Sequence, residues 1–133
     1  KVISKKYISN NNEIKGYISG AYLFNKLGLT TQMPRVITIV TNECPNNNEY
    51  YNKNLGVVIR KPKIKITKDN YLYLQLFDIL INKEKVPIEI NNENEVLFKY
   101  IKDNNLEIEK IFKYSHEIGS IKPIEKLYEL VGK

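Results

Sequence analysis

The sequence predicts a mixed α/β fold of the α+β kind: a small mixed sheet of 3–5 strands packed against several helices, with a mostly helical C-terminal part. Short segments with alternating or β-branched apolar residues fill the first half of the chain, which is typical of strands. From residue 71 onward, apolar residues instead recur at helical spacing between capping and helix-breaking residues. No segment recurs with a period of about 20 to 50 residues, so a solenoid is not expected.

Length and composition predict a single domain covering residues 1–133. Of the 133 residues, 42% are hydrophobic and 27% are charged, as in ordinary globular domains. The chain has neither an apolar run long enough to span a bilayer nor a signal-peptide pattern, so we expect no membrane association. The single cysteine, Cys44, cannot form an internal disulfide, which fits a reducing compartment, and we expect a cytoplasmic protein.

The chain begins with two short predicted elements. Residues 1–9 place several apolar side chains near one face, which predicts a helix. The run Asn10 to Asn12 is a clear break. Alternation over residues 14–18 then predicts a short, half-buried strand.

A capped helix is expected at residues 21–27. Ser19, followed by Gly20, occupies the N-cap position, where a hydroxyl can accept a hydrogen bond from a backbone N–H of the first turn. Gly28 follows the apolar stripe and has the features of a left-handed C-cap. The apolar Leu29 would then close the last turn.

A polar loop joins this helix to a predicted strand at residues 36–41. Its distinctive residues are Thr30, Thr31, Gln32, Pro34 and Arg35. The proline prevents the loop from continuing as helix. Two interpretations stay open: the polar side chains either satisfy backbone groups of the loop, which is the commoner case, or bind a partner.

Two further strand signals follow a polar loop at residues 42–48. Residues 55–60 predict a strand, which Pro62 either ends or marks as an edge or bulge. Alternation over residues 64–67 predicts a second strand or a continuation of the first. We expect these strands to lie beside residues 36–41 as a hairpin or meander.

Basic residues are concentrated in this part of the chain, whose net charge as a whole is +6. No acid interrupts the basic series on the predicted strands, namely Arg60, Lys61, Lys63, Lys65 and Lys68. One interpretation is a solvated face that protects an edge strand from pairing with another chain. The other is a docking surface for an acidic partner or for phosphate. A bias toward AT-rich codons would also enrich lysine without any binding function.

The remainder is predicted to be mostly helical. Asp69 can cap a helix at residues 71–81 that is apolar nearly all round and should be the most buried helix. Gln75 and Asp78 mark its polar side, and we expect Asp78 to face solvent. Three further helices are expected at residues 93–103, 106–115 and 123–130.

One motif resembles a known family. The pattern S-G-A-x-x-x-N-x-L-G-L-T-T-Q-x-P over residues 19–34, followed by a β-branched strand that ends at Thr41, resembles the AbiEi-type antitoxins of bacterial type IV toxin–antitoxin systems. The resemblance covers residues 14–42 and, more weakly, residues 56–82. The motif residues that it singles out are Ser19, Gly20, Asn25, Gly28, Thr30, Thr31, Gln32, Pro34 and Arg35.

The resemblance implies that this chain is equivalent to the C-terminal domain of such an antitoxin. That domain would neutralise a cognate nucleotidyltransferase-type toxin in an abortive-infection system. Transcriptional autoregulation would come from a winged helix, which the family carries before this block and which we expect to lie before residue 1. DNA would then be bound through that absent domain, or weakly through the basic residues. The motif residues would shape a loop and make hydrogen bonds, without a catalytic role.

No catalytic pattern is recognisable in the sequence, so we expect neither an enzyme nor a metal site or cofactor. The chain has one histidine and one cysteine and lacks the spacings of catalytic triads, zinc sites and phosphate-binding loops. Two alternatives to an antitoxin stay open. One is a nucleic-acid-binding accessory domain that uses residues 60–68. The other is a small hydrolase or nuclease, in which Glu43, Asp69, Asp78 or His116 would have to converge.

Overall fold

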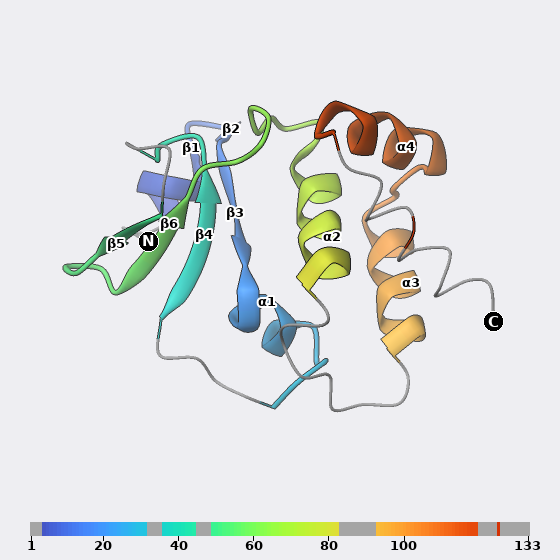
Figure 1. Cartoon of the computed structure of the whole chain (residues 1–133), viewed down its shortest axis with the longest axis horizontal. Coiled ribbons are helices and arrows are strands. Elements are labelled where there is room, and N and C mark those ends of the chain that lie inside the picture. Colours follow the sequence, from blue (N-terminus) through green and yellow to red (C-terminus); the bar gives the residue numbers. More distant parts are fainter. Residues whose placement is uncertain (1–3, 32–35, 45–48, 83–92, 120–124, 126–133) are drawn as a thin grey trace.

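The computed structural model describes residues 4–31, 36–44, 49–82, 93–119 and 125, and it has a sheet-rich side and a helical side (Figure 1). A four-stranded mixed sheet and a two-stranded sheet occupy the left of the view, and the helices that follow residue 70 occupy the right. Helix α2 (Tyr71–Asn82) lies between the sheet and helix α3 (Glu93–Asp103). The predicted fold class is therefore confirmed, including a helical C-terminal third.

The larger sheet has the strand order β3-β4-β6-β5. Its strands are β3 (Gly16–Ser19), β4 (Ile37–Thr41), β5 (Tyr50–Asn52) and β6 (Val57–Arg60). β4 pairs with β3 in the antiparallel sense and with β6 in the parallel sense, and β5 pairs with β6 antiparallel. The strands expected at residues 14–18, 36–41 and 55–60 are present with shifted ends, whereas β5 was not predicted and separates β6 from solvent on that side.

The prediction of a strand at residues 64–67 is wrong. The prediction of a simple hairpin or meander beside residues 36–41 is also wrong. Residues 61–67 are irregular backbone, because Pro62 lacks a donor and the buried Ile66 takes its partner from a side chain. The Ile66 N–H donates to Asn42 Oδ1 at 2.9 Å, and the Asn42 amide Nδ2 donates back to the Ile66 carbonyl at 2.9 Å. A single asparagine thus supplies the two bonds that a neighbouring strand would make.

The N-terminal segment folds into a short helix and a hairpin. The helix expected at residues 1–9 is observed over η1 (Ser4–Ile8), which is a π-helix. The expected break at residues 10–12 is the turn of a hairpin formed by β1 (Ser9–Asn10) and β2 (Glu13–Ile14). Asn11 and Asn12 both have positive φ, 54° and 68°, as the tight turns that join right-handedly twisted strands require.

The larger sheet separates two hydrophobic clusters. Consecutive side chains of a strand point to opposite faces, so Val40 packs with the helices while Ile39 packs with Tyr7 of η1 on the other face. α2 supplies much of the first cluster, including Leu76, Phe77 and Leu80, which are at most 1% exposed. The prediction that this helix is the most buried one is consistent with these values.

The remaining helices cover the same side of the sheet. α1 (Gly20–Lys26) contacts β3, β4 and α2, and α4 (Ile108–Glu117) contacts α2. α3 has the predicted bounds, and α4 begins two residues later than the expected start at residue 106. The helix expected at residues 123–130 lies outside the described residues, except for Glu125, which is helical. Within the described ranges, no helix has both the length and the apolar content that a membrane crossing requires.

Gly16 is required by a close approach between η1 and the sheet. A Cβ atom at this position would collide with the Tyr7 carbonyl oxygen and would lie 2.9 Å from the Val40 carbonyl oxygen. Both neighbours are backbone atoms, which cannot move without displacing η1 or β4. The glycine therefore lets the N-terminal helix lie directly on the edge strand.

Candidate functional site

The turn after α1 closes as its sequence predicts. Gly28 has φ +79°, and its N–H donates to the Asn25 carbonyl at 3.0 Å. The Leu29 N–H donates to the Phe24 carbonyl at 2.9 Å, and the Leu29 side chain is fully buried. These two bonds and the apolar contact are those of a Schellman C-cap, so the helix ends at a fixed place and direction.

The polar residues beyond this cap have different environments. The Asn25 amide Nδ2 donates to the Thr30 carbonyl at 3.3 Å, which ties the loop back to the helix. Thr30 is buried, at 4% exposure, whereas Thr31 is exposed. For Asn25 the contact supports the interpretation that motif side chains satisfy loop backbone groups. The other three predicted loop residues, Gln32, Pro34 and Arg35, lie outside the described residues.

Ser19 stands at the predicted N-cap position of α1, but it does not cap the helix. Its backbone is extended, with φ −135°, and its side chain makes no capping bond. The hydroxyl donates instead to Asp78 Oδ2 on α2, at 2.6 Å. The capping role was wrong because the hydroxyl is directed toward Asp78 and accepts from Arg60 Nη2, at 3.2 Å, in place of a helical N–H. Gly20, next in the chain, begins α1 with φ +74°.

Asp78 is the centre of a polar cluster between the sheet and α2. Arg60 Nη2 lies 3.3 Å from Asp78 Oδ2 and 3.2 Å from Ser19 Oγ. The Tyr17 hydroxyl makes a further hydrogen bond with the carboxylate. The expectation that Asp78 faces solvent is therefore wrong: its side chain is 18% exposed and is held by three partners.

The sheet register explains how these partners meet. Tyr17 on β3 is paired with Val40 on β4, and Val40 is paired with Arg60 on β6. The three residues thus form one row across three strands, and Ser19 lies two residues beyond Tyr17 on the same face. Asp78 reaches this row from the facing side of α2.

Burial changes the proton affinity of both acidic groups in the cluster. Removal from water raises the pKa of Asp78, and the hydrogen bond from Ser19 and the positive charge of Arg60 oppose this effect only in part. Burial, followed by the negative charge of Asp78, raises the pKa of the Tyr17 phenol well above its ordinary value. The phenol therefore stays protonated and is available as a hydrogen-bond donor.

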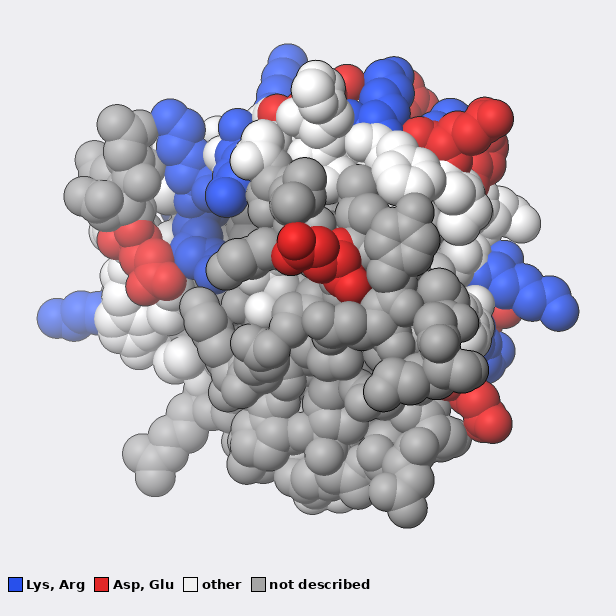
Figure 2. Space-filling view, turned by 45° about the vertical axis from the view of Figure 1, so that its right-hand side comes forward, with Lys and Arg blue, Asp and Glu red and all other residues white. Residues whose placement is uncertain are grey.

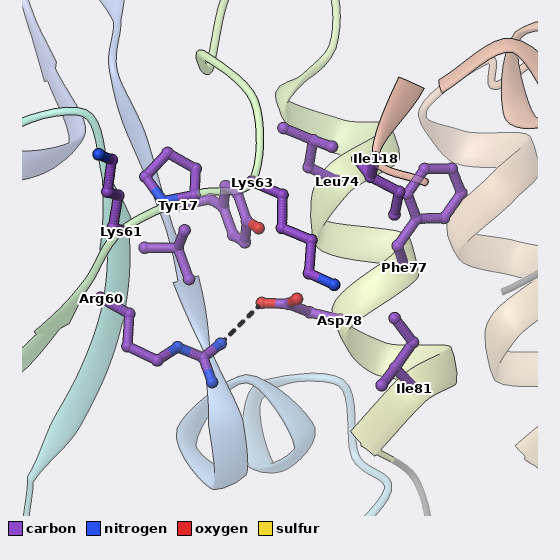
Figure 3. Close-up of a pocket in the computed structure, with 11 residues that line it drawn as sticks. Tyr17, Arg60, Lys61, Lys63, Leu74, Phe77, Asp78, Ile81 and Ile118 are labelled. Atoms are coloured by element: carbon purple, nitrogen blue, oxygen red, sulfur yellow. Dashed lines mark hydrogen bonds and ion pairs between the residues drawn. The ribbon is translucent and has the colours of Figure 1, made fainter. Parts of the chain in front are cut away.

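A pocket of about 330 Å³ opens beside this cluster (Figure 3). Val40, Leu74, Phe77, Ile81 and Ile118 give it apolar walls. Its charged lining consists of Arg60, Lys61, Lys63 and Asp78. In Figure 3 the Arg60 guanidinium and the Lys63 ammonium point toward the Asp78 carboxylate from two sides, whereas the Lys61 ammonium points away.

The predicted basic surface is therefore divided. Arg60 belongs to β6, and Lys61 and Lys63 follow it in irregular backbone, so the basic residues do not share one strand face. Lys65 is exposed and does not line this pocket. Lys68 lines a separate hollow beside the β1–β2 hairpin. Figure 2 shows basic side chains gathered at the upper left of one face and mixed with acidic ones at the upper right.

Of the four residues considered for hydrolysis, only Asp78 lines the pocket. Glu43 pairs with Lys15 at 3.7 Å, and Asp69 lies in the turn before α2, where Asn70 directly precedes the helix in place of the expected cap. His116 lies in the last turn of α4. Among the described residues, no three histidine, cysteine or acidic side chains are grouped so that they could hold a metal ion.

Sequence reasoning did not find the Tyr17–Arg60–Asp78 cluster. Tyr17 alternates with apolar residues on a predicted strand, and Asp78 is the single acid in a largely apolar helix. An acid in such a helix was the available signal, since a charge there has to be paired if the whole helix is buried. The partners of Asp78 lie on two strands that are about forty residues apart in the sequence, and local sequence patterns do not indicate that these strands meet.

Comparisons with known proteins give no relative from which a role for the cluster or the turn could be taken. No family model, no curated protein and no solved structure matches the chain.

Proposed function

We propose that this chain is the toxin-neutralising domain of an AbiEi-type antitoxin and acts by binding a nucleotidyltransferase-type toxin. A winged helix attached to the same protein would supply transcriptional autoregulation. The proposal rests on the resemblance of residues 19–34 to that family and on one structural observation. The observation is that the motif forms a closed helix end that holds Thr31 at the surface.

The closed end suits a binding role because it fixes the backbone before any partner arrives. The Gly28 and Leu29 bonds and the Asn25–Thr30 contact leave the first loop residues little freedom. A preorganised loop loses less conformational entropy on association than a free one does. Thr31 is exposed beside the buried Thr30 and Leu29, so a partner can reach it without unfolding the turn.

The experiment is co-expression of this domain with the protein encoded by the reading frame directly downstream, which on this proposal is a nucleotidyltransferase. We expect the domain to restore growth of cells that express the toxin and to co-purify with it. Thr31→Arg places a long charged side chain on the exposed turn, and we expect it to reduce co-purification at least about tenfold, as a clash within an interface does. Its matched control is Asn54→Arg, which adds the same side chain to the exposed turn between β5 and β6.

Two results would contradict the proposal. One is a toxin that neither co-purifies with the folded domain nor loses toxicity in its presence. The other is an equal loss of binding in both arginine variants, which would place the contact elsewhere or reflect a general effect of charge.

A second candidate is nucleic-acid binding through Arg60, Lys61 and Lys63, because these three cations line one pocket with only one acid among them. Binding to phosphates releases condensed counterions, so the affinity for DNA or RNA would fall steeply as the salt concentration rises. Absence of a gel shift at low salt would exclude this candidate.

A further inference from the structure

The pocket beside Asp78 combines an apolar wall with an excess of positive charge. Its volume of about 330 Å³ is at the small end of the range of ligand sites, about 300–1,000 Å³. Three cations and one carboxylate line it. A site of this composition favours a small ligand that has a negative charge at one end and an apolar body at the other.

The carboxylate offsets only one of the three positive charges that line the pocket, and its Oδ2 is already engaged. Ser19 donates to Asp78 Oδ2 at 2.6 Å, Arg60 lies at 3.3 Å from the same oxygen, and Tyr17 bonds to the carboxylate. Arg60 can bond elsewhere at the same time, since a guanidinium has five N–H donors and its side chain is 33% exposed.

Lys63 supplies the second positive group. Lys63 is an exposed residue of the irregular segment that follows β6. In Figure 3 its ammonium extends over the pocket toward Asp78. Its positive charge lies close enough to lower the pKa of Asp78, although it is the smallest of the causes. Lys63 and Arg60 thus stand on two sides of the Asp78 carboxylate, and an incoming anion would share both cations with it.

We propose that this pocket binds a small organic anion, with a phosphate or carboxylate that shares Arg60 and Lys63 with Asp78 and an apolar ring or chain against Leu74, Phe77 and Ile81. The site is distinct from the turn at Thr31, so this proposal stands or falls independently of toxin binding. Phosphate and carboxylate present the same acceptor oxygens to a guanidinium, and the experiment distinguishes them.

The experiment is an NMR titration of the full chain with four small probes. Phenyl phosphate and phenylacetate carry the ring and either anion, benzyl alcohol carries the ring without charge, and inorganic phosphate carries charge without the ring. We expect one or both ring-bearing anions to shift the amide signals of residues around Tyr17 and Asp78, with the other two probes at least about tenfold weaker. Whichever aromatic anion binds more tightly identifies the preferred head group.

Three variants test the residues. Lys63→Met keeps the aliphatic stem and removes the charge, and we expect the affinity for the bound anion to fall about fivefold to tenfold. Lys65→Met is the matched control, since it removes the same charge from an exposed residue outside the pocket. Asp78→Asn removes the competing negative charge, and we expect anion binding to become about tenfold tighter.

The gain in the Asp78→Asn variant separates ligand binding from a purely structural ion pair, which would give no gain. The proposal is overturned if neither aromatic anion binds at millimolar concentration, or if benzyl alcohol binds as well as they do. It is also overturned if Lys63→Met and Lys65→Met have equal effects. Should the asparagine variant fail to fold, the two lysine variants alone decide the matter.

Discussion

At the scale of single residues, Asp78 is the side chain whose position most affects the chemistry of the molecule. It belongs to a helix that is otherwise packed in the core, and its carboxylate is held by Ser19, Tyr17 and Arg60. Even with these partners, burial raises its pKa above the ordinary value of 3.8. The folded protein therefore binds a proton at this site more tightly than the unfolded chain does.

This raised pKa predicts a particular dependence of stability on pH. As the pH falls from neutrality through the folded-state pKa of Asp78, the folded state takes up the proton first, so the free energy of unfolding rises. The gain is complete below the unfolded value, near 3.8, and is lost again as the pH increases. Urea denaturation of the wild type and of Asp78→Asn at a series of pH values measures it as a difference between the two proteins.

The neighbours of Asp78 do not interfere with this comparison. The Tyr17 phenol, whose pKa is raised by burial, stays protonated over the acidic range. Asp103→Asn, on the exposed surface of α3, controls for the loss of a carboxylate in general. A wild-type-minus-variant difference that stays constant, or that grows toward neutral pH, would show that Asp78 is not destabilised by burial.

At the same scale, sequence reasoning located the right residues and assigned some of them the wrong partners. Ser19 was placed correctly before α1, and Asp78 was placed correctly on α2, but the bond between them joins residues 59 positions apart. Local sequence favours a serine that caps a helix and an aspartate that faces solvent. Ser19 and Asp78 instead bond to each other because β3 packs against α2 in the folded chain.

At the scale of elements, local signals succeeded where the chain satisfies its own backbone. The end of α1 was predictable because Gly28 and Leu29 make their bonds to residues of the same helix. The strand predicted at residues 64–67 failed because Ile66 bonds to the Asn42 side chain, 24 residues away. β5 was missed because Tyr50 and Tyr51 form a strand only through their pairing with β6.

The C-cap of α1 leads to a prediction about Gly28. Its φ of +79° is costly for a residue with a Cβ, although a Cβ would meet nothing within 4 Å. Gly28→Ala should therefore lower the free energy of unfolding by about 1–2 kcal/mol, through backbone strain alone. Gly28→Asn should cost less, because asparagine tolerates the left-handed conformation. Chemical denaturation of the three proteins checks the order, and an alanine variant as stable as the wild type would contradict the cap.

At the scale of the whole molecule, one hydrophobic cluster joins the sheet to helices α1, α2, α3 and α4. It includes Tyr17 and Val40 from the sheet, Phe24 from α1, Leu97 from α3 and Ile111 from α4, around the buried face of α2. Polar bonds reinforce this connection. Gln75 on α2 donates to the Ile18 carbonyl at 3.0 Å, and its carbonyl oxygen lies 2.7 Å from the Tyr100 hydroxyl on α3.

We expect this shared core to unfold in a single cooperative transition. Tyr100→Phe should lower the free energy of unfolding while the transition remains single. The hydroxyl lies 2.7 Å from Gln75 Oε1 and 3.1 Å from the Leu72 carbonyl, and its removal leaves part of this acceptor capacity unsatisfied. The expected loss is about 1–3 kcal/mol. Tyr51→Phe is the control, because Tyr51 is 51% exposed and should change stability by less than about 0.5 kcal/mol. Two resolved transitions in calorimetry would contradict a single unit.

The fold class could be predicted from the sequence because it depends on the periods of apolar residues along the chain. The strand order β3-β4-β6-β5 could not, since nothing local specifies that β6 pairs in parallel with β4 while β5 takes the outer position. The helix end in the candidate turn could be predicted from the sequence, whereas the pocket could not, and the difference lies in how many elements each requires. The turn closes within one helix end, and the pocket is assembled from β3, β4, β6, α2 and the end of α4.

The parallel pairing of β4 with β6 also bears on the route by which the chain folds. The β5–β6 hairpin closes across a short turn, so it can form early from neighbouring residues. Joining Ile37 to Val57, in contrast, requires the intervening segment to return on itself and lose entropy before any contact compensates. Docking of the preformed hairpin onto β4 is therefore expected to be the slow step, and with it the moment at which Arg60 first reaches Asp78.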